Sequence, residues 1–120
     1  MYYLKSEHSF DSAHFLANYE GKCRNIHGHR WRIIIEIMSP SLNTDEALDG
    51  MIVDFSTLKK DIKAEVDYFD HALIIEKDSM KASTLSALKD ENIHIVEVDF
   101  RPTAERFSKY FYDRLKRKGY

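Results

Sequence analysis

The feature that most constrains this chain is a strand-like segment, residues 30–38, directly preceded by a pair of histidines. Its large apolar side chains recur at period two: Trp31, Ile33, Ile35 and Ile37. Immediately before it the chain reads Cys23-Arg24-Asn25-Ile26-His27-Gly28-His29. Because residues two apart on an extended backbone project from one face, His27 and His29 can present both imidazoles to the same point. The segment therefore predicts a long strand that begins at two potential metal ligands.

Two further strands are expected on either side of this segment. Residues 2–14 are rich in aromatic side chains and loosely alternate, which is typical of a strand. Residues 39–50 form a connection that ends in Asp49-Gly50, a pair compatible with a hairpin turn. The apolar residues 51–53 then predict a return strand, so we expect an antiparallel pair here.

The rest of the chain predicts helices and one more strand. From residue 55 onward apolar side chains recur at spacings of three and four, which indicates a helix capped by Asp54 or Ser56. Thr103, after Pro102, is a good N-cap for the last helix. The expected elements are a helix over 55–69, a short helix over 78–89, a strand over 93–100 and a helix over 103–118. Together these elements predict a single α+β domain over residues 1–120.

Composition and charge argue against several classes of function. The chain has 18 Lys and Arg against 20 Asp and Glu, a net charge of -2, which is not the basic balance of a dedicated nucleic-acid-binding protein. No apolar run approaches the roughly 20 residues that span a bilayer, and residues 1–5 show neither an apolar run nor a cleavage signature, so we expect no export. The lone cysteine cannot form an internal disulfide and points to a reducing compartment or to thiol chemistry. We expect a cytoplasmic protein that binds neither nucleic acid nor membranes.

His14, at the end of the first predicted strand, is the first candidate for a third metal ligand. A catalytic zinc usually has three protein ligands and one open position, and neutral imidazole is a common donor. His14 can reach His27 and His29 if its strand pairs with the strand that follows His29. The other interpretation is that His27-Gly28-His29 is a turn whose histidines merely end a strand. The third histidine and the nearby thiol favour a metal site.

Cys23 has three interpretations that spacing alone does not separate. It could be a fourth ligand that closes a structural site of one cysteine and three histidines. It could be a nucleophile or base beside the metal, where a nearby cation lowers the pKa of a thiol. It could also be an ordinary loop cysteine. The cationic neighbours Lys22 and Arg24 favour a thiolate over a buried apolar thiol.

Asp70, His71 and Glu105 are weaker candidates when taken from the residues alone. Adjacent Asp and His side chains rarely bond to each other, so a structural role is favoured for both: Asp70 would accept from backbone donors and His71 would interact with a helix C-terminus. The functional alternative makes His71 a general acid or base whose tautomer a carboxylate fixes. Glu105 stands in the first turn of the last helix, where the helix dipole favours any carboxylate.

Five short motifs follow one another along the chain. They are Phe10-Asp11-Ser12-Ala13-His14, Cys23-x-x-x-His27-Gly28-His29, Gly50-Met51-Ile52-Val53-Asp54-Phe55, Asp70-His71 and Pro102-Thr103-Ala104-Glu105. In this order they resemble the 6-pyruvoyl-tetrahydropterin synthase and 6-carboxy-tetrahydropterin synthase family, from about residue 3 to residue 115. The resemblance implies a T-fold, an antiparallel sheet with two helices packed on one face. It also implies a homo-oligomer, usually a hexamer, with active sites between subunits.

The resemblance also implies a role for each motif residue. It identifies His14, His27 and His29 as zinc ligands and Cys23 as a catalytic thiol that accepts a proton without binding the metal. Asp70 and His71 look like a relay that assists proton transfer. Thr103 and Glu105 fall in the segment that lines the pterin pocket.

The spacing of the cysteine motif points to one branch of the family. Three residues separate Cys23 from His27, which is similar to the bacterial 6-carboxy-tetrahydropterin synthases. That branch is a zinc-dependent lyase that converts 7,8-dihydroneopterin triphosphate to 6-carboxy-tetrahydropterin, releasing acetaldehyde and triphosphate, on the route to queuosine and other 7-deazapurines. One alternative is a 6-pyruvoyl-tetrahydropterin synthase, which eliminates triphosphate only. The other is a zinc- and pterin-binding protein without catalysis.

Two features depart from the family pattern. Members continue after the last helix into a strand bearing a glutamate, whereas this sequence ends at Tyr120, so we expect that strand to be missing and one sheet edge to be unpaired. Arg106 stands where an asparagine commonly follows the position of Glu105, and its cation could reach a phosphate.

Overall fold

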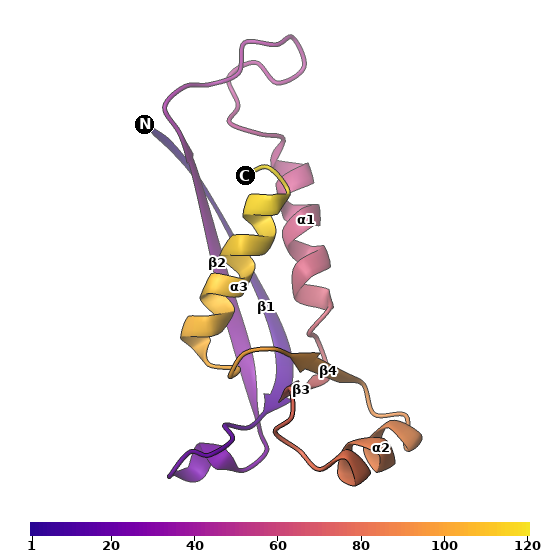
Figure 1. Ribbon diagram of the computed structural model, residues 1–120. Helices are drawn as coiled ribbons and strands as arrows, with labels where there is room; N and C mark the ends of the chain where they lie inside the picture. The colour runs from indigo at the N-terminus through magenta and orange to yellow at the C-terminus, as the bar shows by residue number, and fades with distance from the viewer.

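The computed structural model describes residues 1–120 as a four-stranded sheet with three α-helices (Figure 1). In chain order the elements are β1 (Tyr2–His14), the 3₁₀ turn η1 (Lys22–Arg24), β2 (His27–Ser39), α1 (Phe55–Asp67), β3 (Ala72–Glu76), α2 (Ala82–Asp90), β4 (Ile95–Val98) and α3 (Ala104–Arg117). The α+β class expected from the sequence is confirmed. None of the helices combines the length and the hydrophobicity needed to cross a membrane.

β1 and β2 form one long antiparallel ladder that dominates the sheet. Its register runs from Tyr2 opposite Ser39 to His14 opposite His27. β2 begins three residues earlier than the segment predicted from its apolar alternation, so the two histidines of the His-Gly-His motif belong to the strand itself. The turn interpretation of that motif is therefore wrong, because its backbone is already paired with β1.

The other two strands make the sheet mixed, although an antiparallel sheet was expected. The strand order is β2-β1-β3-β4, with β3 parallel to the end of β1 and β4 parallel to β3. β3 was not predicted from the sequence. It is a short apolar run after a helix, largely buried, and therefore lacks the alternation that marks a strand with one face in water.

The return strand expected over residues 51–53 does not form. The side-chain amide of Asn43 donates to the carbonyls of Met51 and Ile52, at 3.0 Å and 2.9 Å. The backbone N–H of Asn43 also donates to the Met51 carbonyl. Since these carbonyls are occupied within the loop, the segment is held as a turn and has no strand partner.

Helices α1 and α3 pack on one face of the β1–β2 ladder, as expected (Figure 1). Asp54 caps α1 by accepting from the backbone of Ser56 and Thr57, and Thr103 caps α3 by accepting from Arg106. Between the two helices and the sheet lies one core, which buries Phe10, Phe69, Phe107 and Phe111 together with Leu58 and Ile62. By contrast, α2 has no buried residue and projects from the end of the molecule near β3 and β4.

An ion-pair network also joins the two packed helices. Glu65 of α1 is buried, and it accepts from Nε and Nη2 of Arg114 on α3 at 3.0 Å and 3.2 Å. Lys118 lies 3.3 Å from the same carboxylate. Near the end of the chain, the Tyr120 hydroxyl donates to Asp61 on α1. These contacts fix α3, whose N-terminal end lies beside the candidate site described next.

Candidate metal centre and active site

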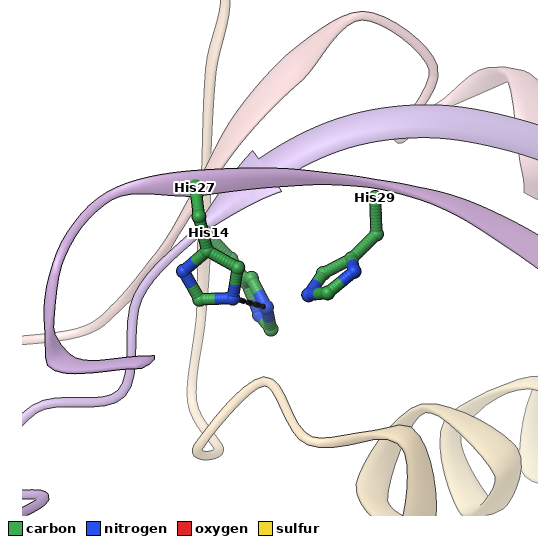
Figure 2. Close-up of side chains that lie close together, drawn as sticks. All are labelled: His14, His27 and His29. Carbon is green, nitrogen blue, oxygen red and sulfur yellow. Dashed lines mark hydrogen bonds between the residues drawn. The ribbon is translucent and has the colours of Figure 1, made fainter. Parts of the chain in front are cut away.

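Three histidines meet at the end of the β1–β2 ladder. The register places His14 opposite His27, and His29 follows two residues along β2, so the three side chains project from one face (Figure 2). Their potential ligand nitrogens all lie within 4.8 Å of one another. The Nε2 atoms of His14 and His27 are 3.1 Å apart. The strand pairing assumed when His14 was chosen as the third donor is confirmed.

The backbone fixes the tautomers of two of these histidines. The Nδ1 atom of His14 bonds the Pro102 carbonyl at 2.8 Å, and Nδ1 of His27 bonds the Asn25 carbonyl at 2.7 Å. A carbonyl can only accept, so each Nδ1 carries the proton and each neutral ring leaves its Nε2 with a lone pair. Burial lowers the pKa of His14 to about 4, which keeps this ring neutral near pH 7. At 3.1 Å the two Nε2 atoms can share one cation, either a proton or a metal ion.

The donor set fits zinc. Tetrahedral ligands at about 2.05 Å from a zinc ion lie about 3.3 Å from one another, close to the separation of the two Nε2 atoms. Three imidazoles with a fourth position open to the pocket form a donor set that catalytic zinc sites use. Carbonyl partners on the outer nitrogens orient the rings and raise their basicity, as is usual for metal-binding histidines.

Trp31 forms a wall of this site that was not identified from the sequence as a site residue. Its ring lies edge-on to His14 and His29, with centroid separations of 5.1 Å and 5.3 Å. Its indole N–H donates to the buried Ser12 hydroxyl at 2.7 Å, which holds the ring in place. The sequence signal was present, because Trp31 stands two residues after His29 on the same strand and therefore shares its face.

The histidines open into a pocket of about 390 Å³ in which most of the predicted site residues gather. Its lining includes the three histidines together with Cys23, Thr103 and Glu105. Thr103 and Glu105 come from the start of α3, more than sixty residues after the end of β2, so only the tertiary fold joins them to the histidines. The Thr103 hydroxyl is already bonded to the Arg106 backbone as the helix cap.

Cys23 is half-buried in η1, beside the histidines but outside their close group. Its carbonyl accepts from the backbone of Leu16 at 2.8 Å, which closes the loop between β1 and β2. The thiol thus shares the pocket with the histidines, whereas the ligand atoms that converge within 4.8 Å are the three imidazoles alone. This placement favours a group that acts on a bound molecule over a fourth metal ligand.

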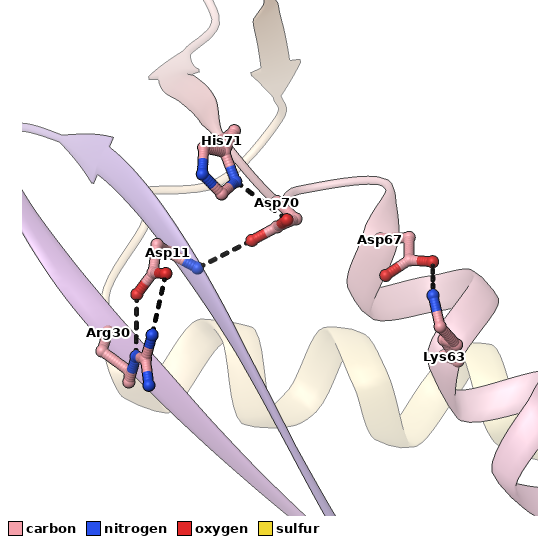
Figure 3. A network of polar contacts seen from close by, with 6 residues as sticks. All are labelled: Asp11, Arg30, Lys63, Asp67, Asp70 and His71. Carbon is pink, nitrogen blue, oxygen red and sulfur yellow. Dashed lines mark hydrogen bonds and ion pairs between the residues drawn. The ribbon is translucent and has the colours of Figure 1, made fainter.

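Asp70 and His71 do bond to each other, contrary to the expectation for adjacent residues. His71 Nδ1 lies 2.9 Å from the Asp70 carboxylate, and the left-handed backbone of His71, with φ of 58°, turns its ring back toward that group (Figure 3). Asp70 also accepts from the backbone N–H of Asp11 at 2.9 Å, so its role as an acceptor for a backbone donor is confirmed.

Asp70 and His71 each stabilise the charged form of the other. Hydrogen bonds from the Asp11 backbone and from His71 hold the pKa of Asp70 below its ordinary value. The Asp70 carboxylate in turn raises the pKa of the exposed His71 above its ordinary value of 6.5. The geometry is that of an imidazole whose tautomer a carboxylate fixes, the arrangement a general acid or base requires.

The Asp70–His71 pair lies away from the three histidines of the same chain. It adjoins Asp11, which pairs with Arg30 at 3.0 Å on the sheet face opposite the helices (Figure 3). His14 and His29 alternate with these residues along their strands and project from the helix face. Neither Asp70 nor His71 lines the pocket of the three histidines. One chain therefore presents the two groups of predicted site residues on different faces.

Comparison with known proteins decides the family. The family model described as 6-pyruvoyl tetrahydropterin synthase matches this sequence over residues 3–119. The chain belongs to this family.

Several relatives that are about a third identical to this chain carry the name of the 6-carboxy branch. A 6-carboxy-5,6,7,8-tetrahydropterin synthase from Haemophilus influenzae is 37% identical over 118 residues, covering 97% of this chain and 83% of that protein. One of the same name from Synechocystis is 32% identical, covering 96% of this chain and 97% of that protein. The resemblance inferred from the five motifs is confirmed.

Solved structures support the fold. An uncharacterised protein from Wolinella succinogenes superposes with a TM-score of 0.78 at 22% identity, covering 98% of this chain and 84% of that one. The Caenorhabditis elegans 6-pyruvoyl tetrahydropterin synthase gives a TM-score of 0.63 at 22% identity, covering 97% and 77%. The T-fold expected from the resemblance is therefore the fold of this chain.

Proposed function

We propose that this chain is a zinc-dependent 6-carboxy-5,6,7,8-tetrahydropterin synthase, a lyase that acts on 7,8-dihydroneopterin triphosphate. Its products are 6-carboxy-tetrahydropterin, acetaldehyde and triphosphate, with one water molecule consumed to supply the second carboxylate oxygen, and its pathway is that of queuosine and other 7-deazapurines. The observation that carries this proposal is the convergence of His14, His27 and His29 in one pocket. The names of the Haemophilus and Synechocystis relatives support the choice of branch.

In this proposal His14, His27 and His29 hold the zinc ion through their inward-facing nitrogens. A bound zinc ion would act as a Lewis acid on the oxygens of the substrate side chain. The carbonyls of Pro102 and Asn25 keep two of the three rings oriented for this task. Trp31 closes the side of the site that faces the core and excludes water from it.

Cys23, Thr103 and Glu105 are proposed to act on the substrate itself. The Cys23 thiolate accepts a proton from the substrate side chain, a role that its place beside the histidine group supports. The Glu105 carboxylate, at the pocket rim, can accept two N–H bonds from a pterin ring. Thr103 lines the same rim and, as the cap of α3, holds Glu105 at its place in the first helical turn.

Asp70 and His71 are proposed to serve the pocket of a neighbouring copy. Support comes from their location near Asp11, on the sheet face turned away from the chain's own histidines. His71 is exposed, and Asp70 fixes its tautomer, so its outer nitrogen can exchange a proton with a molecule bound to another subunit. In a homo-oligomer each site would then combine Cys23 of one copy with His71 of the next.

The outer face of the sheet supports assembly into such an oligomer. Tyr3 and Met38 are exposed there and lie directly opposite each other in the β1–β2 register, and Ile34 is exposed on the same face, beyond the Lys5–Glu36 pair. An exposed apolar pair such as Tyr3 and Met38 can be covered by a second copy of the chain. The molecule is also elongated, 57 Å by 30 Å by 21 Å, because the ladder extends beyond the helices.

Product analysis tests the proposed function directly. Purified chain loaded with zinc is incubated with 7,8-dihydroneopterin triphosphate, and the products are identified by mass. Formation of 6-carboxy-tetrahydropterin with acetaldehyde supports the proposal. A product that has lost only triphosphate would instead identify a 6-pyruvoyl-type synthase, the activity in the name of the matching family model.

The matched variant Cys23→Ala separates the catalytic thiol from a metal ligand. We expect turnover to fall to background while one zinc ion per chain is retained. Tight binding of pterin without turnover by the wild-type chain would point to a non-catalytic binding protein. Loss of zinc from Cys23→Ala would make Cys23 a ligand and contradict its assignment as proton acceptor.

A further inference from the structure

Arg101 makes contacts that none of the assigned roles explains. It lies in the connection between β4 and α3, directly before Pro102, and is half-buried. Its Nη2 donates to the backbone carbonyl of Ala17 at 3.0 Å. Its guanidinium also stacks over the ring of Tyr19, 5.5 Å from the ring centroid. A single side chain thus holds two points of the loop between β1 and β2, more than eighty residues away in sequence.

The loop that Arg101 holds is the one that carries Cys23. After Tyr19 the chain passes Gly21, where a Cβ atom would come within 2.6 Å of the Tyr19 ring, so the backbone packs directly on that ring. Two residues later Cys23 closes the loop through its carbonyl, which accepts from Leu16. The guanidinium, the Tyr19 ring and the backbone at Gly21 therefore pack in series, and the packed backbone lies two residues before Cys23.

On its other side, Arg101 belongs to the segment that orients the metal centre and the pocket rim. The next residue, Pro102, accepts the Nδ1 proton of His14 through its carbonyl. The Arg101 carbonyl accepts from the Thr103 backbone at 2.7 Å, immediately before α3 begins. The side chain of Arg101 thus connects the thiol loop to the short segment that positions His14 and the rim residue Thr103.

We propose that Arg101 is a positioning residue that fixes the Cys23 loop, residues 15–25, relative to the three histidines. The guanidinium is suited to this task because it can stack on an aromatic ring and donate in its own plane at the same time. A lysine at this position offers a charge but no plane. The catalytic consequence rests on the proposed function: without Arg101 the loop remains, but the thiol is no longer held at one distance from a bound substrate.

Hydrogen exchange tests the positioning role without reference to activity. We expect Arg101→Ala to increase amide exchange several-fold in residues 15–25, and Tyr19→Leu, which removes the ring on which the guanidinium stacks, to do the same. Arg101→Lys should restore part of the protection. The matched control is Arg117→Ala, an exposed arginine at the end of α3 that makes no ion pair or hydrogen bond in the structure. It should leave exchange in the loop unchanged.

Kinetics and metal analysis then test the consequence for the site. In Arg101→Ala we expect zinc content to stay near that of the wild type and KM to change by less than about two-fold, while kcat falls by about ten- to a hundred-fold because a reacting group is misplaced. Arg101→Lys should recover part of kcat, and Arg117→Ala should match the wild type. A general loss of stability would instead lower zinc content and raise exchange throughout the chain.

The outcomes separate this inference from the proposed function. Unchanged exchange in residues 15–25 of Arg101→Ala overturns the inference whether or not the wild type turns over. Increased exchange with an unchanged kcat also overturns it, because the loop would then not need to be held. If the wild type forms no product yet Arg101→Ala loosens the loop, the proposed function fails and the hold on the loop stands as a structural fact.

Discussion

His14 and His27 face each other across the β1–β2 ladder with their Nε2 atoms 3.1 Å apart, and the backbone carbonyls behind them hold the ring protons on the opposite nitrogens. A pair of unprotonated nitrogens at this distance is repulsive in the absence of a cation. The ladder therefore presents a preformed site in which little rearrangement is needed on binding.

Removing any one of the three histidines should abolish stoichiometric zinc binding. An outer partner of a metal ligand already contributes about 10- to 100-fold in affinity, so loss of a ligand should cost more than ~100-fold. We expect His14→Ala, His27→Ala and His29→Ala to lose zinc during dialysis against a weak chelator, as measured by metal analysis. Trp31, the one tryptophan, lies against His14 and His29, so its fluorescence should report Co²⁺ binding in the wild type and in none of these three variants.

The matched control for these variants is His94→Ala. His94 is an exposed histidine before β4, outside the group of three. It should keep one zinc ion per chain and the full fluorescence response. Zinc retained at wild-type affinity by His29→Ala would show that the site needs only the two facing histidines.

The Asp70–His71 pair predicts a specific dependence on pH. Asp70 raises the pKa of His71, so the protonated ring gains an interaction in the folded chain that persists up to the raised pKa and is lost as pH rises through it. Asp70→Asn removes the negative charge, and we expect His71 to titrate at lower pH in that variant. Nuclear magnetic resonance of the imidazole C–H signals measures the change, with His94 as internal reference.

The same substitution predicts a kinetic effect if His71 supplies a proton during turnover. The alkaline limb of the kcat profile should then move to lower pH in Asp70→Asn, in parallel with the titration of His71. A profile that stays in place while the His71 signal moves would remove this residue from the rate-limiting proton transfer.

Shared active sites predict complementation between two inactive variants. Cys23→Ala and His71→Ala should each lack activity alone. When the two are mixed at equal amounts and allowed to exchange subunits, about a quarter of the sites in a closed ring should combine an intact thiol with an intact imidazole. Recovery of activity to that level would be measured by product formation, and the separately assembled variants mixed without exchange serve as control. No recovery after verified exchange would place both groups in one chain's site.

Because Glu65 is buried between the helices, its partner Arg114 should contribute more to the free energy of unfolding than the exposed Lys109 on the same helix. Arg114→Met leaves Glu65 in a buried location with Lys118 as its only cation, and we expect a loss of about 1–3 kcal/mol in the free energy of unfolding. Lys109→Met removes only an exposed pair with Asp113 one turn away, and should cost less than about 0.5 kcal/mol. Urea unfolding measures both, and equal losses would contradict a special role for the buried pair.

The sequence predicted those helices and strands that have one face in the core and the other in water, because such elements have a periodic pattern of apolar residues. The alternation of β1 and β2 and the spacing of apolar residues in α1 and α3 each follow from a core on one side only. β3 escaped prediction because it is covered on both faces, and residues 51–53 were wrongly predicted as a strand because Asn43 binds their carbonyls from a distance in sequence. A hydrogen bond from a side chain eight or nine residues earlier does not change the periodicity of apolar residues in the sequence.

For the candidate site, the residue types were predictable and their partners were not. His14, His27 and His29 were identified from their chemistry and strand positions, and the structure brings them together. The carbonyl of Pro102 and the guanidinium of Arg101 escaped notice because a backbone acceptor has no signature in sequence, and an arginine among many is not distinctive until its partners are known. That His71 lies on a different face from the three histidines could be seen only once the β1–β2 register was known.

The pairing of His14 with His27 has a consequence for how the ladder assembles. A slip of one residue between β1 and β2 would turn His14 to the face that carries Asp11, and the three imidazoles would no longer converge. Only one alignment of the two longest strands therefore creates the ligand set. A metal ion that binds during folding would stabilise this alignment and not the shifted ones. Metal binding would therefore favour the native pairing of β1 with β2, to which β3 and β4 are added.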